Sequence, residues 1–111
     1  MNIKKFYNKS FLNLTDVINV FNFDFTSVKD QSFPIIHYND TAYIEVNTFF
    51  YLFFKELIFI DIEVDDFNST IMLHLNYIDH NIIKILSNVK LKYSITSSRF
   101  EGKICLTFMY K

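Results

Sequence analysis

The chain has 111 residues, half of them apolar and 14 of them phenylalanine, and its formal net charge at pH 7 is -1. This length and composition predict one globular domain with a single core and exclude a disordered chain. One cysteine excludes an internal disulfide and a cysteine-based zinc cluster, and one glycine excludes a glycine-rich phosphate loop.

The net charge hides a separation of charge along the chain. Residues 38–80 carry eight acidic side chains and one basic one, whereas residues 81–111 carry six basic side chains and one acidic one. A basic end on a nearly neutral protein indicates one surface that meets a polyanion and another that does not.

Residues 1–32 are predicted to form an extension with one short helix. Thr15 and Asp16 are candidate caps for this helix, and the apolar positions from Val17 to Phe21 lie near helical spacing. The alternation of Phe21, Phe23 and Phe25 with polar residues then favours a short strand or an extended arm.

A strand and a helix are expected next. Residues 35–38 form the strand, which ends at an Asn39-Asp40 turn. The helix starts at a cap on Asn47 or Thr48 and runs to about Glu56, with an apolar stripe that consists of Phe49, Phe50, Phe53, Phe54 and Leu57.

A β-hairpin over residues 58–77 follows from two alternating segments around the turn at residues 66–69. Asp61, Glu63 and Asp65 share the face of its first strand that is turned to solvent. Asp79 then caps a short helix that ends near Asn88, and residues 91–95 and 104–110 form two final strands.

These elements define an α+β fold. From residue 33 the order is β-α-β-β-α-β-β, which predicts a largely antiparallel sheet with two helices on one face. We therefore expect a domain over residues 33–111 that is preceded by an extension over residues 1–32.

The residues that usually carry chemistry are scattered along the chain. His37, His74 and His80 fall in different elements and lack metal-ligand spacing with Cys105. Like-facing acids on a strand lie about 7 Å apart, too far to hold one ion by themselves, so a solvated face explains the acidic run. We expect a protein that is not an enzyme and has no metal site, no cofactor and no small-molecule substrate.

The environment of the chain is expected to be the cytoplasm. The most apolar stretch, residues 47–60, contains Lys55 and Glu56, whereas a membrane span needs about 20 apolar residues. Lys4 and Lys5 precede a polar, asparagine-rich stretch, which differs from a signal peptide.

The basic last third of the chain is the candidate binding site. Lysine and arginine attract RNA phosphates, and unpaired bases stack on aromatic rings. The candidate RNA-binding residues are Lys84, Lys90, Lys92, Tyr93, Arg99 and Lys103.

One family has a similar pattern from residue 33 onward. Its first helix carries spaced phenylalanines, an acid and an apolar strand start, as in Phe50, Phe53, Phe54, Glu56, Ile58 and Ile60. Its capped helix after the hairpin is similar to residues 78–86, and its last two strands match residues 91–95 and 104–110. From about Phe33 onward the chain thus resembles the eukaryote-specific large-subunit ribosomal protein twenty-two family. The resemblance implies docking on ribosomal RNA beside neighbouring proteins.

Two classes of function remain open from the sequence. The first is a non-enzymatic subunit of a ribonucleoprotein, with the large ribosomal subunit as the expected assembly. The alternative is a protein-interaction module, either a subunit of another assembly or a small phage or viral inhibitor, because aromatic residues are abundant and an acidic hairpin can meet a basic partner.

Overall fold

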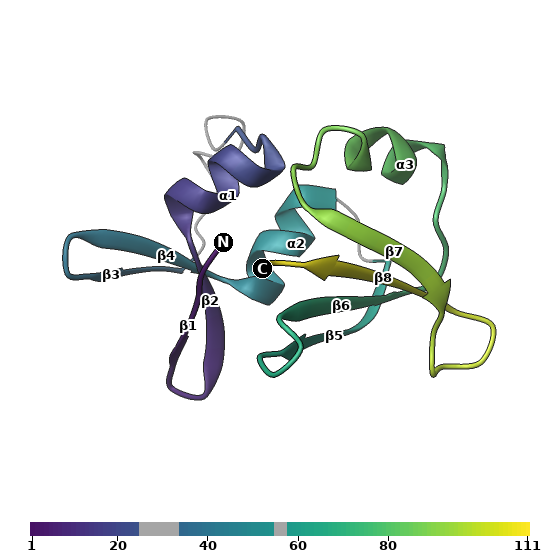
Figure 1. The fold of residues 1–111 in the computed structure, drawn as a ribbon, viewed down its shortest axis with the longest axis horizontal. Coiled ribbons are helices and arrows are strands. Elements are labelled where there is room, and N and C mark those ends of the chain that lie inside the picture. Colours follow the sequence, from purple (N-terminus) through teal and green to yellow (C-terminus); the bar gives the residue numbers. More distant parts are fainter. Residues whose placement is uncertain (25–33, 55–57) are drawn as a thin grey trace. The chain divides into compact units, whose positions relative to one another are not determined.

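The computed structural model describes residues 1–24, 34–54 and 58–111. The chain divides into two compact units, Met1–Lys55 and Glu56–Lys111. Each unit contains a four-stranded antiparallel sheet and at least one helix, which confirms the α+β class (Figure 1). The expected single sheet with both helices on one face is wrong, because the strands pair in two separate sheets.

Unit 1 consists of two β-hairpins, each followed by a helix. Its elements are β1 (Ile3–Phe6), β2 (Lys9–Asn13), α1 (Leu14–Phe21), β3 (Ile35–Tyr38), β4 (Thr41–Glu45) and α2 (Val46–Phe54). The sheet order is β1-β2-β4-β3. Since β2 pairs with β4, the strands β1 and β2 of the expected N-terminal extension supply two of the four strands of this sheet.

Unit 1 is an internal repeat of a hairpin and a helix. Each element of the second repeat begins at the same sequence offset from its counterpart in the first, the offset from Ile3 to Ile35. The counterparts are β1 and β3, β2 and β4, and α1 and α2. Leu12 pairs with Ile44, which is its own equivalent in the second repeat, and the flanking pairs also exchange under the same offset. A pseudo-two-fold axis therefore passes through the Leu12–Ile44 pair.

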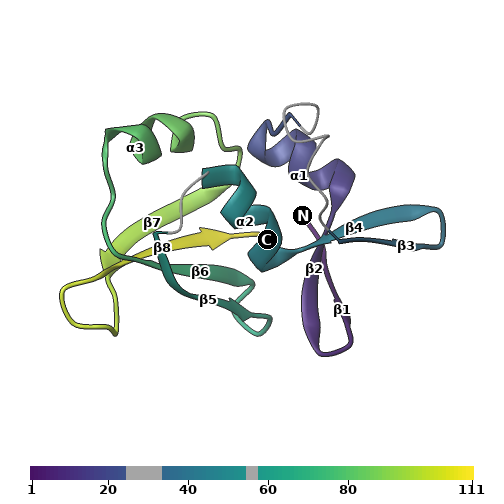
Figure 2. The ribbon, with the colours of Figure 1, turned by 180° about the vertical axis from the view of Figure 1, so that it is seen from behind.

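Unit 2 has the same sheet order as unit 1. Its elements are β5 (Phe59–Asp65), β6 (Thr70–Leu75), α3 (His80–Leu86), β7 (Lys92–Ser97) and β8 (Ile104–Met109), with the order β5-β6-β8-β7. The expected hairpin, the Asp79 cap and the last two strands are confirmed. Figure 2 shows this sheet from behind.

Each unit has an apolar core of its own residues. In unit 1, Phe21 is 1% exposed, and its ring centroid lies 5.0 to 5.6 Å from those of Phe49, Phe50 and Phe53. In unit 2, the buried cross-strand pairs Ile71–Phe108 and Leu73–Leu106 occupy one face of the sheet. These phenylalanines of α2 thus belong to a core, as their helical spacing predicts. The expected cap on Asn47 or Thr48 is wrong, because both residues already lie within α2, and Glu56 and Leu57 of the expected helix lie outside the described residues.

The start of α1 corrects the sequence prediction. The cap is Asn13, whose side chain accepts hydrogen bonds from the backbone N–H groups of Thr15 and Asp16. Phe21 is the last residue of α1 and not part of a strand, and the helix ends there because Asn22 takes the left-handed conformation with φ of 53°. Asn22, Phe23 and Asp24 form no strand, so the first of the two alternatives is wrong. Phe25, also assigned to that strand, lies outside the described residues.

Candidate nucleic-acid interface

The six residues predicted to bind RNA all lie in unit 2, but they fall in separate places. Lys84 is on α3, Lys90 follows that helix, and Lys92 and Tyr93 begin β7. Arg99 and Lys103 lie in the turn between β7 and β8. The length of β7 separates these two groups, about 17 Å at 3.3 Å per residue.

Arg99 is bound by the acidic strand of its own unit. Its Nη2 atom lies 2.9 Å from Asp61 Oδ2, and its Nε–H donates to Glu63 Oε1 at 2.9 Å. A second hydrogen bond runs from Nη2 to Glu63. The Arg99 guanidinium holds the pKa of the Glu63 carboxyl below its usual value. A phosphate would compete with these two carboxylates for Arg99, so the acidic hairpin and the basic end partly neutralise each other here.

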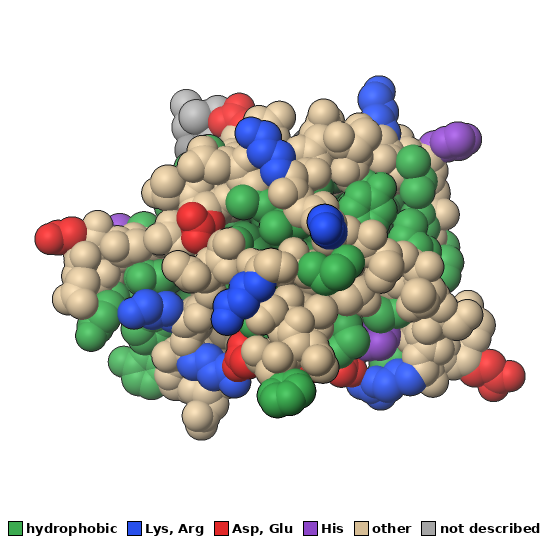
Figure 3. Space-filling model, in the orientation of Figure 1, with side chains coloured by type: hydrophobic (Ala, Val, Ile, Leu, Met, Phe, Trp, Pro, Cys, Tyr) green, Lys and Arg blue, Asp and Glu red, His purple; other side chains and the backbone are tan. Residues whose placement is uncertain are grey.

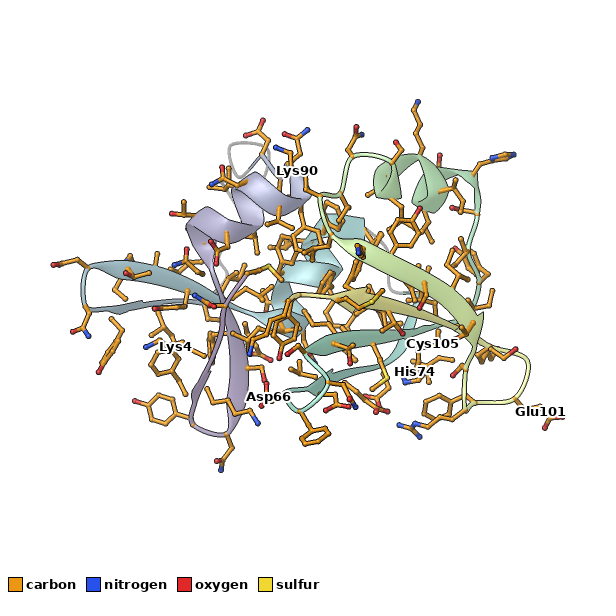
Figure 4. The ribbon with its side chains drawn as sticks, in the orientation of Figure 1. Lys4, Asp66, His74, Lys90, Glu101 and Cys105 are labelled. Carbon is orange, nitrogen blue, oxygen red and sulfur yellow. The ribbon has the colours of Figure 1, made fainter. Side chains whose placement is uncertain are left out.

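A buried histidine anchors the same turn. His74 is 4% exposed, its Nδ1 atom lies 2.8 Å from Ser98 Oγ, and its Nε2 atom lies 3.3 Å from Glu63 Oε1. Ser98 Oγ also accepts a hydrogen bond from the Phe100 backbone N–H, which leaves its own hydrogen to donate to His74. Figure 4 shows His74 next to Cys105, its partner on β8. These contacts fasten the turn to the sheet.

Among the described residues, no three histidine, cysteine or acidic side chains are grouped closely enough to hold an ion. Within the same ranges, no helix has the length and apolarity needed to cross a membrane.

A basic and aromatic surface lies on the β1–β2 hairpin in unit 1, which the sequence analysis did not identify. The hairpin carries Lys4, Lys5 and Lys9, and no acidic residue precedes Asp16. Lysine side chains gather over this hairpin in Figure 3. We call residues 3–13 the basic hairpin.

Tyr7 stands at the tip of the basic hairpin with 90% of its surface exposed. It has φ of 52° and the next residue, Asn8, has φ of 63°, so both turn residues are left-handed. Such two-residue turns favour asparagine, aspartate and glycine, whereas a bulky side chain in this conformation is strained. Tyr7 therefore has an unfavourable backbone and buries almost nothing in return.

The second repeat provides a direct comparison for this turn. Its two turn residues are Asn39 and Asp40, with φ of 49° and 61°. The same backbone is thus built there from residues that suit it. Because the fold does not require tyrosine at the tip of the first hairpin, Tyr7 is a candidate for a functional role.

More aromatic side chains share one face of this sheet. The ring of Phe6 lies 5.5 Å from that of Phe11, 5.6 Å from that of Tyr38 and 5.5 Å from that of Tyr43. The two edge strands of a flat sheet of this order would be about 14 Å apart. The contact between Phe6 on β1 and Tyr38 on β3 therefore shows that the sheet bends toward this face.

Lysine and tyrosine meet at the rim of that face. Lys4 Nζ lies 5.7 Å from the ring centroid of Tyr38, which is 48% exposed. Lys9 is 64% exposed and lies 3.8 Å from the Glu45 carboxylate. The surface thus combines exposed rings with exposed cations, the combination that single-stranded nucleic acids need. The run Lys4-Lys5-Phe6-Tyr7-Asn8-Lys9 was the available signal in the sequence.

Comparison with family models, curated proteins and solved structures finds no match to this chain. The resemblance over residues 33–111 stays a prediction.

Proposed function

We propose that this protein is a non-enzymatic RNA-binding subunit of a ribonucleoprotein, and that the basic hairpin is its main RNA contact. The observation that carries the proposal is Tyr7, an exposed ring held in a strained turn on a hairpin whose charged side chains are all positive. The resemblance described above favours the large ribosomal subunit in the cytoplasm as the assembly.

The proposed contact uses two kinds of interaction. Tyr7 stacks on an unpaired base, and the three lysines of the hairpin approach the phosphates on either side of it. Stacking needs no particular base, because every base has an aromatic face. The proposal therefore predicts binding that depends strongly on salt and weakly on sequence.

The predicted lysines of unit 2 have a secondary place in this proposal. Lys84, Lys90 and Lys92 are exposed and can add long-range attraction for RNA. Arg99 contributes less, because Asp61 and Glu63 already bind its guanidinium.

A variant that copies the second repeat tests the role of Tyr7. Tyr7→Asn places in the first hairpin the residue type found at position 39, so we expect the fold to remain and its stability to rise by up to about 1 kcal/mol. Loss of one stacked base weakens binding by roughly 1 to 3 kcal/mol, or about 5- to 150-fold. The probe is a fluorescent single-stranded RNA of mixed sequence, about 12 nucleotides long.

The matched control is Phe67→Asn. Phe67 is 94% exposed and also lies in a hairpin turn, but that turn is flanked by Asp65 and Asp66. We expect this variant to bind RNA like the unchanged protein. An unchanged affinity for Tyr7→Asn, or an equal loss for both variants, would refute the proposed contact.

The charge contribution has its own test. Lys9→Gln should reduce the dependence of log affinity on log salt by about 0.7 for single-stranded RNA. No affinity for RNA at low salt would instead favour the protein-interaction module, and absence from ribosomal fractions would remove the ribosome as the assembly.

A further inference from the structure

The two edges of the unit 2 sheet differ in how they are protected. The edge strand β5 has a shift in its pairing register between Phe59 and Asp61, as at a β-bulge, and carries three acids on one face. Bulges and charges are the usual means of preventing a further strand from adding to an edge. This edge is therefore protected against pairing.

The opposite edge, β7, is less protected, because it has no bulge and its one charged residue, Lys92, lies at its start. Its six residues pair with β8 in continuous register, from Lys92–Met109 to Ser97–Ile104, without a bulge. All six are exposed, and the strand contains no acid and no proline. Within the described part of the chain, β7 pairs with one strand only, so the outward row of N–H and C=O groups is regular and available.

The charges around β7 indicate the kind of segment it would accept. Lys90 and Lys92 lie at its start, and Lys111 closely follows Met109, the partner of Lys92. Lys103 lies just beyond its other end, in the turn before β8. The same turn also carries Glu101, so a strand with acidic side chains would meet positive charge mainly at the start of β7.

The side chains of β7 add a place for apolar contacts. Tyr93 and Ile95 alternate with polar residues and share one face, and they are 40% and 44% exposed. Strand addition takes its affinity from the backbone and its specificity from such alternate positions. We propose that β7 binds an extended segment of a partner protein, with alternating acidic and apolar residues, as a fifth strand of the sheet.

A peptide taken from this chain is a suitable probe. The sequence of residues 59–65, Phe-Ile-Asp-Ile-Glu-Val-Asp, alternates in the required way. Added to the full-length protein, the capped peptide should protect the amides of β7 from hydrogen exchange and shift their NMR signals. A peptide of the same sequence with N-methyl groups along one edge keeps the charges but cannot form the ladder, and it should give neither effect.

Comparison of two variants separates this site from the RNA contact of the basic hairpin. Lys90→Glu with Lys92→Glu should weaken peptide binding by about tenfold or more, whereas Tyr7→Asn should leave it unchanged and weaken RNA binding alone. Equal binding of the N-methylated peptide would overturn the proposal. So would protection of β7 by RNA or by self-association in place of the peptide.

Discussion

Replacing either residue of the pair at the pseudo-two-fold axis, Leu12 or Ile44, with alanine should lower the free energy of unfolding of unit 1 by a similar amount. Leu12 and Ile44 are both 0% exposed and face each other across the axis. Each change to alanine removes three carbons, worth about 2.4 kcal/mol of transfer free energy at about 0.8 kcal/mol per carbon. The cavity that remains brings the expected loss to about 3 to 5 kcal/mol.

Urea denaturation followed by circular dichroism measures this loss. The free energy of unfolding of a small domain is only about 5 to 15 kcal/mol, so the alanine variants can fail to fold. Ile44→Val therefore serves as a milder variant, with an expected loss of about 1 kcal/mol. The double variant should deviate from additivity by at least about 0.5 kcal/mol, since the two residues are cross-strand partners. A difference between Leu12→Ala and Ile44→Ala of more than about 2 kcal/mol would refute the symmetry argument.

The remaining predictions concern unit 2 and the helix caps. Arg99→Ala should raise the pKa of Glu63 toward 4.5, because the guanidinium is the main cause of its lowering; an unchanged NMR titration would contradict this. Because the pKa of Glu63 is lower in the folded state, its ionised carboxyl stabilises the fold above about pH 4.5, and this contribution is lost as the pH falls through the folded-state pKa. The unchanged protein should therefore lose more stability on acidification than Arg99→Ala. Asn13→Ala and Asp79→Ala each remove a side chain that caps a helix and should each cost about 1 kcal/mol in urea denaturation, whereas no loss would show that the caps contribute nothing.

The elements of unit 2 could be predicted because local signals there agree. The alternation on either side of residues 66–69 marks a hairpin, and Asp79 accepts a hydrogen bond from the Ile82 backbone N–H as a cap should. The first strand of unit 1 gave a weaker signal. Its sequence is Ile-Lys-Lys-Phe, which does not alternate over a length that periodicity can detect.

The internal repeat was hidden for a similar reason. When residues 3–22 are set against residues 35–54, only two positions keep the same residue, Ile3 with Ile35 and Phe21 with Phe53. What the two copies share is residue class, as with Leu12 and Ile44 at the axis. Sheet pairing between β2 and β4 revealed the symmetry, and pairing between distant strands is not encoded in any one segment.

The charge separation along the chain does not show which basic side chains are already paired with acids. The basic count of the last third was correct, but a count does not reveal that Asp61 and Glu63 bind Arg99. Likewise, the nearly neutral first third conceals that its described lysines all lie on one hairpin. Local concentration of charge with exposed rings is a better guide to a nucleic-acid contact than the charge of a segment.

Ultraviolet crosslinking of the full-length protein to single-stranded RNA, with mass spectrometry of the attached peptides, tests the central claim most directly. The proposal predicts that the main crosslinked residue is Tyr7 in the basic hairpin. Crosslinks confined to residues 84–103, with none in residues 3–13, would contradict it and place the RNA contact in unit 2.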